Sequence, residues 1–372
     1  LRICNNGQSM LLYLRNQLLD INKAGFNVFV ICSYNKELFD FCMNNNISFF
    51  PIAFERRFSL FSDIKSFFYL FKFYSKHRIH ICHSWNSKCG LLNALISFIF
   101  RINFRVHTFA GIPWENLSFF SSLIPKISDF IIFLLNHKCF ADSQSEAKFL
   151  NESLCINSNK ISVLASGSIA GINLKKFNLN RNFTINKWFL KNKNNLIFIG
   201  RITKEKGIDD LVNGFNRYAL PNTGLLILGD IDNTNGSINQ DTLDLIHNSN
   251  SIKWIKFTKE PEKFLKFCDI LVIPSYREGF GNVVIEAGAF KVPSIGYKST
   301  GLVDSIKHNH SGYLVKKGNM KSFFTKVNYL IKNTNTRRLF GDNAYQIVVD
   351  NFECSMISEE VIKMYSRGSN TT

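Results

Sequence analysis

The sequence predicts an α/β protein made of two Rossmann-like, doubly wound domains that face each other across a cleft. Short runs rich in β-branched and aromatic residues recur along the whole chain, and longer stretches with helical periodicity separate them. The 372 residues are enough for about two domains of ~150 residues each. A polar stretch with several glycines lies near the middle of the chain.

The alternation of strand and helix runs through both halves in order. Apolar periodicity favours helices at 10–24, 91–100 and 207–218. Leu1 to Cys4 reads as the end of a strand, and residues 161–164 are strand-like. The other expected strands are 26–32, 47–54, 79–84, 104–111 and 138–143 in the first half, and 196–201, 225–230, 252–258, 270–275, 292–297 and 312–315 in the second.

The most plausible domain break lies at 166–180, where Gly167, Gly171 and an Asn-rich stretch follow a strand-like run. We therefore expect an N-terminal domain over 1–166 and a C-terminal domain over 178–350. Residues 351–372 are expected to form a helix that packs back on the N-terminal domain.

Composition narrows the possible functions. The 45% apolar and 20% charged fractions are ordinary for a globular protein and argue against a disordered chain or an integral membrane bundle. The 45 Lys and Arg against 28 Asp and Glu leave a net charge of +17. Such a charge favours an anionic partner, which is a nucleic acid, a phosphorylated small molecule or a lipid surface.

The cysteines and the apolar runs suggest a cytoplasmic protein. Nine scattered cysteines without a C-x-x-C pair are typical of reduced thiols that fill a core. The apolar stretches 91–100 and 119–135 fall short of the ~20 residues that a membrane span needs, and Pro125, Lys126 and Asp129 interrupt the second. Because the chain opens at Leu1 inside an apparent strand, we expect some N-terminal residues to be missing.

The loop at 274–287 has the strongest chemical pattern. Gly279 and Gly281 follow a strand and let the backbone approach a ligand, and Asn282 begins a helix whose free N–H groups suit a phosphate. Glu278 and Glu286 beside a phosphate make sense if they accept hydrogen bonds from sugar hydroxyls. The alternative is an ordinary strand-to-helix turn with Glu286 in solvent.

A second loop, 199–207, places two cations after a strand. Arg201 follows the strand end, and Lys206 lies at the foot of the next helix. A planar guanidinium and a point-charge ammonium together suit a diphosphate. The alternative is a solvated basic loop.

A third segment, 167–177, combines Gly-Ser-x-x-Gly with Phe177 and suits either a hinge or the margin of a cleft.

Together these stretches resemble the family 4 retaining glycosyltransferases of the GT-B fold. Glu278 and Glu286 match the family's E-x7-E pattern, and Arg201 and Lys206 match its pyrophosphate-binding Arg and Lys. The resemblance covers roughly residues 80 to 350 in consistent order and includes the segments 141–143, 167–177, 301–304 and 311–315.

This resemblance implies transfer of a hexose or N-acetylhexosamine from a nucleotide-diphosphate sugar, most simply a UDP-sugar, with retention and with no metal or other cofactor. Glu278 would contact the transferred sugar, Glu286 would hold the ribose, and Arg201 and Lys206 would neutralise the leaving diphosphate. Backbone groups at the helix start would bind the donor, namely those of Gly279, Phe280, Gly281, Asn282 and Val283. The absence of a D-x-D or His/Asp ligand cluster in the loops at 199–207 and 274–287 agrees with a metal-free site. The resemblance also makes 1–166 the acceptor-side domain and 178–350 the nucleotide-sugar-binding domain.

The acceptor side departs from the family. Many members have His before the Gly where this chain has Ala110, and His107 lies three residues earlier within a strand, where a core or edge histidine is the alternative. Gly7 is the only glycine of the first loop. His107 and Gly7 are the candidate acceptor-side residues. The run 105–114 resembles a bacterial subset of cell-surface polysaccharide enzymes, which make lipopolysaccharide or capsule, and this implies a lipid-linked saccharide acceptor.

A basic and aromatic stretch at 55–78 suggests contact with an anionic bilayer, which would place the protein peripherally on the inner face of the cytoplasmic membrane. The alternative is a core helix with a basic outer edge.

Two other functions stay open. One is a sugar-nucleotide 2-epimerase or a silent sugar-nucleotide binder. The other is a nucleic-acid-binding protein, although no reading module is present and nucleic acid is not an expected partner.

Overall fold

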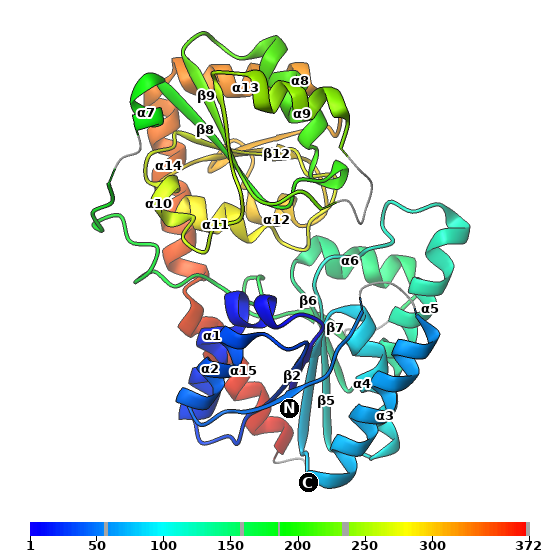
Figure 1. The fold of residues 1–372 in the computed structure, drawn as a ribbon. Coiled ribbons are helices and arrows are strands. Elements are labelled where there is room, and N and C mark those ends of the chain that lie inside the picture. The colour runs from blue at the N-terminus through cyan, green and yellow to red at the C-terminus, as the bar shows by residue number, and fades with distance from the viewer. Residues whose placement is uncertain (56–58, 157–159, 185–186, 233–237, 370–372) are drawn as a thin grey trace. The chain divides into compact units, whose positions relative to one another are not determined.

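The computed structural model describes residues 1–55, 59–156, 160–184, 187–232 and 238–369 (Figure 1). The chain divides into two compact units. The N-terminal unit consists of Leu1–Gly171 together with Cys354–Thr372, and the C-terminal unit consists of Ile172–Glu353. The crossing point between them lies inside the 166–180 stretch, and the chain returns to the N-terminal unit at Cys354.

The N-terminal unit is built on a seven-stranded sheet with the order β3-β2-β1-β4-β5-β6-β7. Every described pair of neighbouring strands is parallel. Such a sheet needs crossover helices, which then cover its faces. The strands are β1 (Arg2–Cys4), β2 (Phe29–Cys32), β3 (Ser48–Pro51), β4 (Ile81–Trp85), β5 (Phe104–Phe109), β6 (Lys138–Ala141) and β7 (Ile161–Val163).

Helices lie on both faces of this sheet (Figure 1). On one face α1, α2 and α15 pack over the strands, and on the other α3, α4 and α5 lie next to one another. The helices are α1 (Gly7–Lys23), α2 (Lys36–Asn44), α3 (Leu60–Lys76), α4 (Ser87–Ile99), α5 (Phe119–Leu135), α6 (Gln144–Ser153) and α15 (Cys354–Ser369).

The C-terminal unit repeats the design with a six-stranded parallel sheet of order β10-β9-β8-β11-β12-β13. Its strands are β8 (Asn194–Ile199), β9 (Thr223–Leu228), β10 (Ile252–Ile255), β11 (Ile270–Ile273), β12 (Ser294–Tyr297) and β13 (Gly312–Val315). Its helices are α7 (Lys187–Lys191), η1 (Lys204–Lys206), α8 (Ile208–Tyr218), α9 (Gln240–Asn248), α10 (Glu262–Leu265), α11 (Asn282–Gly288), α12 (Leu302–Ser305), α13 (Met320–Lys332) and α14 (Thr334–Asn351).

The last helix, α15, belongs to the core of the N-terminal unit. Val361 and Tyr365 are buried among side chains of α1 and the sheet. The Tyr365 hydroxyl receives a hydrogen bond from Arg2 Nη1 at 2.8 Å and lies 2.7 Å from His83 Nδ1. Because these polar groups are buried, removing one partner would leave the others unsatisfied. The end of the chain therefore stabilises the sheet formed by its beginning.

These two parallel sheets confirm the predicted fold class of two Rossmann-like domains. Each expected strand is present, but several end earlier than the apolar run that predicted them. The run 47–54, for example, gives a strand only over Ser48–Pro51. Ile52 and Phe54 lie beyond the strand and are still buried, because the connection packs its apolar side chains into the core. Hydrophobicity therefore marks burial more faithfully than it marks strand ends.

All nine cysteines are free thiols, and all but Cys155 are buried. This arrangement matches the expected use of cysteine as a small core residue. Within the described part of the chain, no helix is both long and apolar enough to cross a membrane.

Candidate functional site

The loops singled out in the sequence meet where the strand order of the C-terminal sheet reverses. From β8 the chain winds outward through β9 to β10, and it then returns to β11 beside β8 and continues to β12 and β13. The 200–207 loop follows β8 and the 274–281 loop follows β11. In open α/β sheets, ligands bind at such a reversal, outside the carboxyl ends of the strands.

Lys206 and Glu278 form the central contact between these two loops. Lys206 Nζ lies 2.5 Å from Glu278 Oε1, and the two side chains are 17% and 13% exposed. The pair is therefore largely withdrawn from water, where the attraction between opposite charges is stronger than on an open surface. The cation of one predicted motif and the first glutamate of the other lie together.

Backbone contacts fix the distance between the two loops. Tyr276 N donates to the carbonyl of Glu205 at 2.9 Å, and Arg277 Nη2 lies 2.9 Å from Glu205 Oε2. Gly207 has a φ of +69°, and a Cβ there would lie 2.1 Å from the carbonyl oxygen of Pro274. Only glycine fits this close approach. Glu205 and Gly207 thus hold Lys206 opposite Glu278.

Arg201, which the sequence analysis expects to bind a diphosphate together with Lys206, forms an ion pair with an acid of the protein. Its Nη1 lies 2.7 Å from Asp232 Oδ2, in the connection after β9, and its side chain is 42% exposed. The two loops approach closely, because a Cβ on Gly229 would lie 1.9 Å from the carbonyl oxygen of Gly200. The structure therefore places Arg201 at the same sheet edge but pairs it with an acid that the sequence analysis did not single out.

The loop after β12 supports the glycine-rich turn. Gly301 has a φ of +80°, and a Cβ there would lie 2.7 Å from the carbonyl oxygens of Glu278 and Gly279. Gly281, with a φ of +87°, directly precedes α11. Phe280 and Gly281 are buried, whereas Asn282 and Val283 at the helix start are partly exposed.

Glu286 lies one turn into α11 in a charged, poorly hydrated environment. Burial raises its pKa to about 7, nearby Lys176 opposes this shift, and Glu262 adds to it. Glu262 is itself buried, with Lys176 Nζ 3.5 Å and Arg181 Nη1 3.9 Å from its carboxylate oxygens. A carboxyl group with this environment is a strong candidate for a functional residue. Its side chain is only partly exposed, which differs from the fully solvated helix position considered as the alternative.

Asp210 joins α8 to β12 and to the loop that follows β11. Its Oδ2 accepts hydrogen bonds from Tyr276 Oη at 2.6 Å and from Tyr297 Oη at 2.9 Å. Burial, together with the Asp210 charge, raises the pKa of Tyr276 to about 12. Both phenols therefore remain protonated donors.

The two acceptor-side candidates are closely enclosed within the N-terminal unit. His107 is fully buried in β5, its Nδ1 lies 2.8 Å from Ser84 Oγ, and burial lowers its pKa to about 3. This placement favours the core histidine over a ligand contact. Gly7 begins α1, where a Cβ would lie 2.7 Å from the carbonyl oxygen of Ser33. Close chain packing explains the glycine.

Several buried acids escaped the sequence analysis. Glu146 accepts from Gly111 N at 2.6 Å through one oxygen and from Asp142 N at 2.8 Å through the other, so that one side chain joins two strand-end loops. The buried Glu262 and the partly buried Asp232 were missed as well. Each lies in an ordinary polar segment, and its partners lie far away in sequence. The capping pattern at Ser143 was the only local signal for Glu146.

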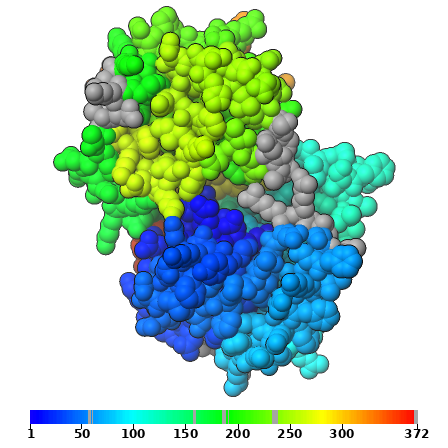
Figure 2. Space-filling view, in the orientation of Figure 1, coloured from blue at the N-terminus to red at the C-terminus, as the bar shows by residue number. Residues whose placement is uncertain are grey.

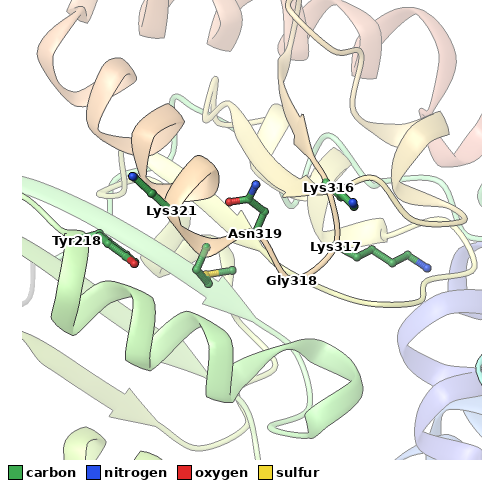
Figure 3. Close-up of a pocket in the computed structure, with 7 residues that line it drawn as sticks. Tyr218, Lys316, Lys317, Gly318, Asn319 and Lys321 are labelled. Carbon is green, nitrogen blue, oxygen red and sulfur yellow. The ribbon is translucent and has the colours of Figure 1, made fainter.

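A separate pocket of about 500 Å³ lies at the start of α13, with a lining that includes three lysines. Figure 3 shows that Lys316 and Lys317 extend to one side and Lys321 to the other, so they do not converge on one point. In the described residues, no group of three or more His, Cys, Asp or Glu side chains is arranged to hold a metal ion.

Comparisons with known proteins show the family of this chain. The family model for glycosyl transferases group 1 matches residues 180–347. The capsular polysaccharide biosynthesis glycosyltransferase CapM of Staphylococcus aureus is 32% identical, over 95% of this chain and 93% of its own. The UDP-Gal:alpha-D-GlcNAc-diphosphoundecaprenol alpha-1,3-galactosyltransferase of Escherichia coli is 23% identical, over 95% of this chain and 90% of its own.

Solved structures share the fold at low identity. HepE from Anabaena, determined with UDP-glucose, has a TM-score of 0.77 at 16% identity and covers 98% of this chain and 99% of its own. Sucrose-phosphate synthase from Thermosynechococcus elongatus has a TM-score of 0.80 at 16% identity, with 100% and 99% covered. The comparisons give no support to an epimerase or a nucleic-acid-binding protein. The chain has two doubly wound units and is 32% identical to CapM over 95% of its length. It therefore belongs to the group 1 glycosyltransferases of the GT-B fold.

Proposed function

We propose that this glycosyltransferase transfers a hexose or N-acetylhexosamine from a UDP-sugar to a lipid-linked saccharide during assembly of a surface polysaccharide, with retention of the anomeric configuration. The observation that carries the donor assignment is the Lys206–Glu278 pair at the reversal of strand order. The names of the relatives support the rest, since they include a capsular polysaccharide enzyme and two transferases with diphospho-undecaprenol acceptors.

Each site residue has a role that suits its chemistry. Lys206 and Arg201 supply positive charge to the diphosphate as the bond from the sugar to its phosphate oxygen breaks. Glu278 accepts hydrogen bonds from the transferred sugar, and Glu286 accepts them from the ribose. Backbone groups of Gly279 through Val283 border the phosphates. These assignments need no metal cofactor, because the two cations provide the charge that a divalent ion supplies elsewhere.

The N-terminal unit is proposed to hold the acceptor. The carboxyl ends of its parallel strands lie near the Gly7 turn and the loop that Glu146 binds, and ligand sites form at such ends. Gly7 contributes here through its backbone alone. His107 remains a positioning residue for its strand rather than an acceptor contact.

We further propose a cytoplasmic location with peripheral binding to the inner face of the membrane and no nucleic-acid partner. Three observations support it: the net charge of +17, the exposed lysines of α3 and the lipid-linked acceptors in the names of relatives. The described part of the 55–78 stretch includes α3. Arg56, Arg57 and Phe58 lie outside the described residues.

The test is transfer from labelled UDP-sugars to short-chain diphosphate-linked saccharides by the full chain. Product should form only when acceptor is present, and the reaction should continue in EDTA. NMR should show that the transferred sugar has the same anomeric configuration in the product as in the donor. A donor altered without acceptor would indicate an epimerase, and loss of activity in EDTA would refute metal independence. Lys204→Ala, an exposed lysine of the same short helix, is the matched control for Lys206→Ala.

A further inference from the structure

Helix α5 of the N-terminal unit is apolar on its outer side and partly polar on its inner side. Outward-facing Phe120 and Ile124 are 85% and 65% exposed, and Phe119, Ile127 and Leu134 are also exposed. The buried side includes polar residues, among them Ser122, Ser128 and Asp129. A helix that faces water normally shows the reverse pattern. The outer side of α5 is therefore suited to an apolar environment.

The inner polar residues of α5 have partners within the protein. Asp129 Oδ2 accepts a hydrogen bond from Trp114 Nε1 at 2.7 Å, and the Ser122 hydroxyl donates to the carbonyl of Phe119 at 2.8 Å. The Ser122 bond satisfies its hydroxyl within the helix, and the Asp129–Trp114 bond ties the inner side of α5 to the rest of the N-terminal unit. If the apolar side turned inward, Asp129 would move away and leave the buried Trp114 Nε1 without its acceptor.

The neighbouring helices extend this surface. Helices α3, α4 and α5 form one layer on one face of the sheet, so their outer sides face the same way (Figure 1), and segments of their colours lie on the molecular surface in Figure 2. On α3, Phe61 and Phe68 are exposed, and Phe98 is exposed near the end of α4. Exposed aromatic and aliphatic side chains gathered on the helices of one layer are typical of an interaction site.

Charge selects the occupant of this surface. Lys65, Lys72 and Lys76 are exposed on α3 among its aromatic residues. A second copy of the chain would bring the same lysines and another net charge of +17, and the two copies would repel each other. An anionic bilayer offers both a hydrocarbon layer for the aromatic side chains and a negative surface for the lysines.

We propose that α5 lies in the plane of an anionic bilayer with its outer apolar side inserted, while the lysines of α3 contact the headgroups. At 17 residues the helix is about 25 Å long at ~1.5 Å per residue. This length suits an in-plane helix. This inference rests on the membrane association proposed above. It goes further because it names the helix that enters the lipid.

The test is cosedimentation of the full chain with vesicles of phosphatidylglycerol and phosphatidylcholine in equal parts, and with pure phosphatidylcholine. The wild type should bind the anionic vesicles preferentially. Phe120→Glu combined with Ile124→Glu should reduce that binding at least about tenfold, because two inserted side chains become charged. Leu339→Glu with Met356→Glu is the charge-matched control, since both residues are exposed and lie elsewhere, and it should bind nearly as well as the wild type.

A second measurement does not depend on losing binding. The Phe120→Trp variant should show tryptophan fluorescence that brominated lipids quench, and Leu339→Trp should show no added quenching. Equal vesicle binding by the α5 double variant, or no quenching at position 120, would overturn the proposal. So would a dimer in sedimentation that the double variant converts to a monomer, because a second copy would then cover this face.

Failure of this inference can be told apart from failure of the proposed function. Transfer to a short-chain acceptor in the absence of vesicles should be the same for the α5 double variant and the wild type. If transfer occurs but vesicles do not bind, the inference alone fails. If vesicles bind through α5 and no transfer occurs with any UDP-sugar, the proposed function fails while the membrane surface stands.

Discussion

The ammonium group of Lys206 lies 2.5 Å from a carboxylate oxygen of Glu278, although 72 residues separate them in sequence. Their loops follow β8 and β11, which are neighbours only because the strand order reverses there. The relationship therefore depends on the topology of the sheet as well as on the two motifs. It places a cation next to a carboxylate that can accept hydrogen bonds from hydroxyl groups. A site that binds a sugar diphosphate needs both.

Replacing Lys206 with Ala should reduce kcat/KM for transfer by about 100-fold or more, as loss of a charge that stabilises a leaving group typically does. It also leaves Glu278 without its partner in a largely buried setting. Steady-state kinetics with a UDP-sugar and a short-chain acceptor measure the effect. Lys204→Ala should retain nearly full activity, and equal losses in the two variants would remove Lys206 from the mechanism.

Glu286 should make stability depend on pH. Burial raises its pKa to about 7 in the folded protein, above the ordinary value near 4.5, so folding favours the protonated form. The free energy of unfolding should therefore fall as pH rises from about 4.5 to 7, by at most about 1.4 kcal/mol per pH unit. Urea unfolding at several pH values should show this fall in the wild type and a smaller one in Glu286→Gln.

The same carboxyl group should make donor binding depend on pH in the opposite direction. If the ionised form accepts hydrogen bonds from the ribose, affinity for a UDP-sugar should increase as pH rises through about 7. A UDP-sugar suits calorimetry here better than UDP, whose terminal phosphate also titrates near neutral pH. A wild-type affinity that is flat between pH 6 and 8 would argue against Glu286 as a donor contact.

The sequence was sufficient to predict the two doubly wound domains and the two loops that meet at the strand reversal. Glycines and charged residues after apolar runs are local signals, and parallel topology brings such loops together. Asp232, Glu262 and Glu146 could not be predicted in this way. Each acts through a partner that only the folded chain brings near, such as Arg201 for Asp232.

His107 shows the opposite limit of sequence reasoning. A histidine near a strand end and a glycine turn suggested a possible acceptor contact, but the ring is fully buried and lies against Ser84 Oγ. Alternation along a strand decides which side of the sheet a side chain faces, and the packing above that side decides whether it meets solvent. A Cβ on Gly90 of α4 would lie 2.4 Å from the His107 ring, so this helix covers the ring closely.

Gly207→Ala should destabilise the protein and misplace Lys206. The new Cβ would lie 2.1 Å from the carbonyl oxygen of Pro274, at a φ of +69° that non-glycine residues rarely adopt. We expect a loss of about 2 kcal/mol or more in the free energy of unfolding, measured in urea. Gly25→Ala is the control, because its φ is also positive while no atom lies within 4 Å of its Cβ position. If both variants lost a similar free energy of unfolding, the positive φ alone would explain the loss at Gly207.

Asp210→Ala should weaken the attachment of α8 to the strands beneath the site. The change leaves the hydroxyls of Tyr276 and Tyr297 without their shared acceptor, which costs about 1–3 kcal/mol for a buried donor. Replacing both tyrosines with Phe in the same variant should recover part of this loss, because no unpaired hydroxyl remains. Unfolding in urea gives the free energy of unfolding of the wild type, of Asp210→Ala and of Asp210→Ala with both tyrosines changed to Phe. If the two Tyr→Phe changes lowered the stability of Asp210→Ala still further, Asp210 would not be acting as their shared acceptor.

Asp232→Asn should strengthen donor binding, because Asp232 forms an ion pair with Arg201, the cation proposed to bind the diphosphate. In the ligand-free protein Arg201 Nη1 lies 2.7 Å from Asp232 Oδ2, and the half-exposed guanidinium must exchange this partner for phosphate oxygens. An ion pair this exposed is worth roughly 0.2–1 kcal/mol, so affinity for a UDP-sugar should rise by about 1.4- to fivefold in calorimetry. Arg201→Ala should weaken binding, and in the double variant the Asp232→Asn change should have no further effect, since no cation remains to be released. If Asp232→Asn weakened binding as much as Arg201→Ala, Asp232 would instead be orienting Arg201 toward the diphosphate.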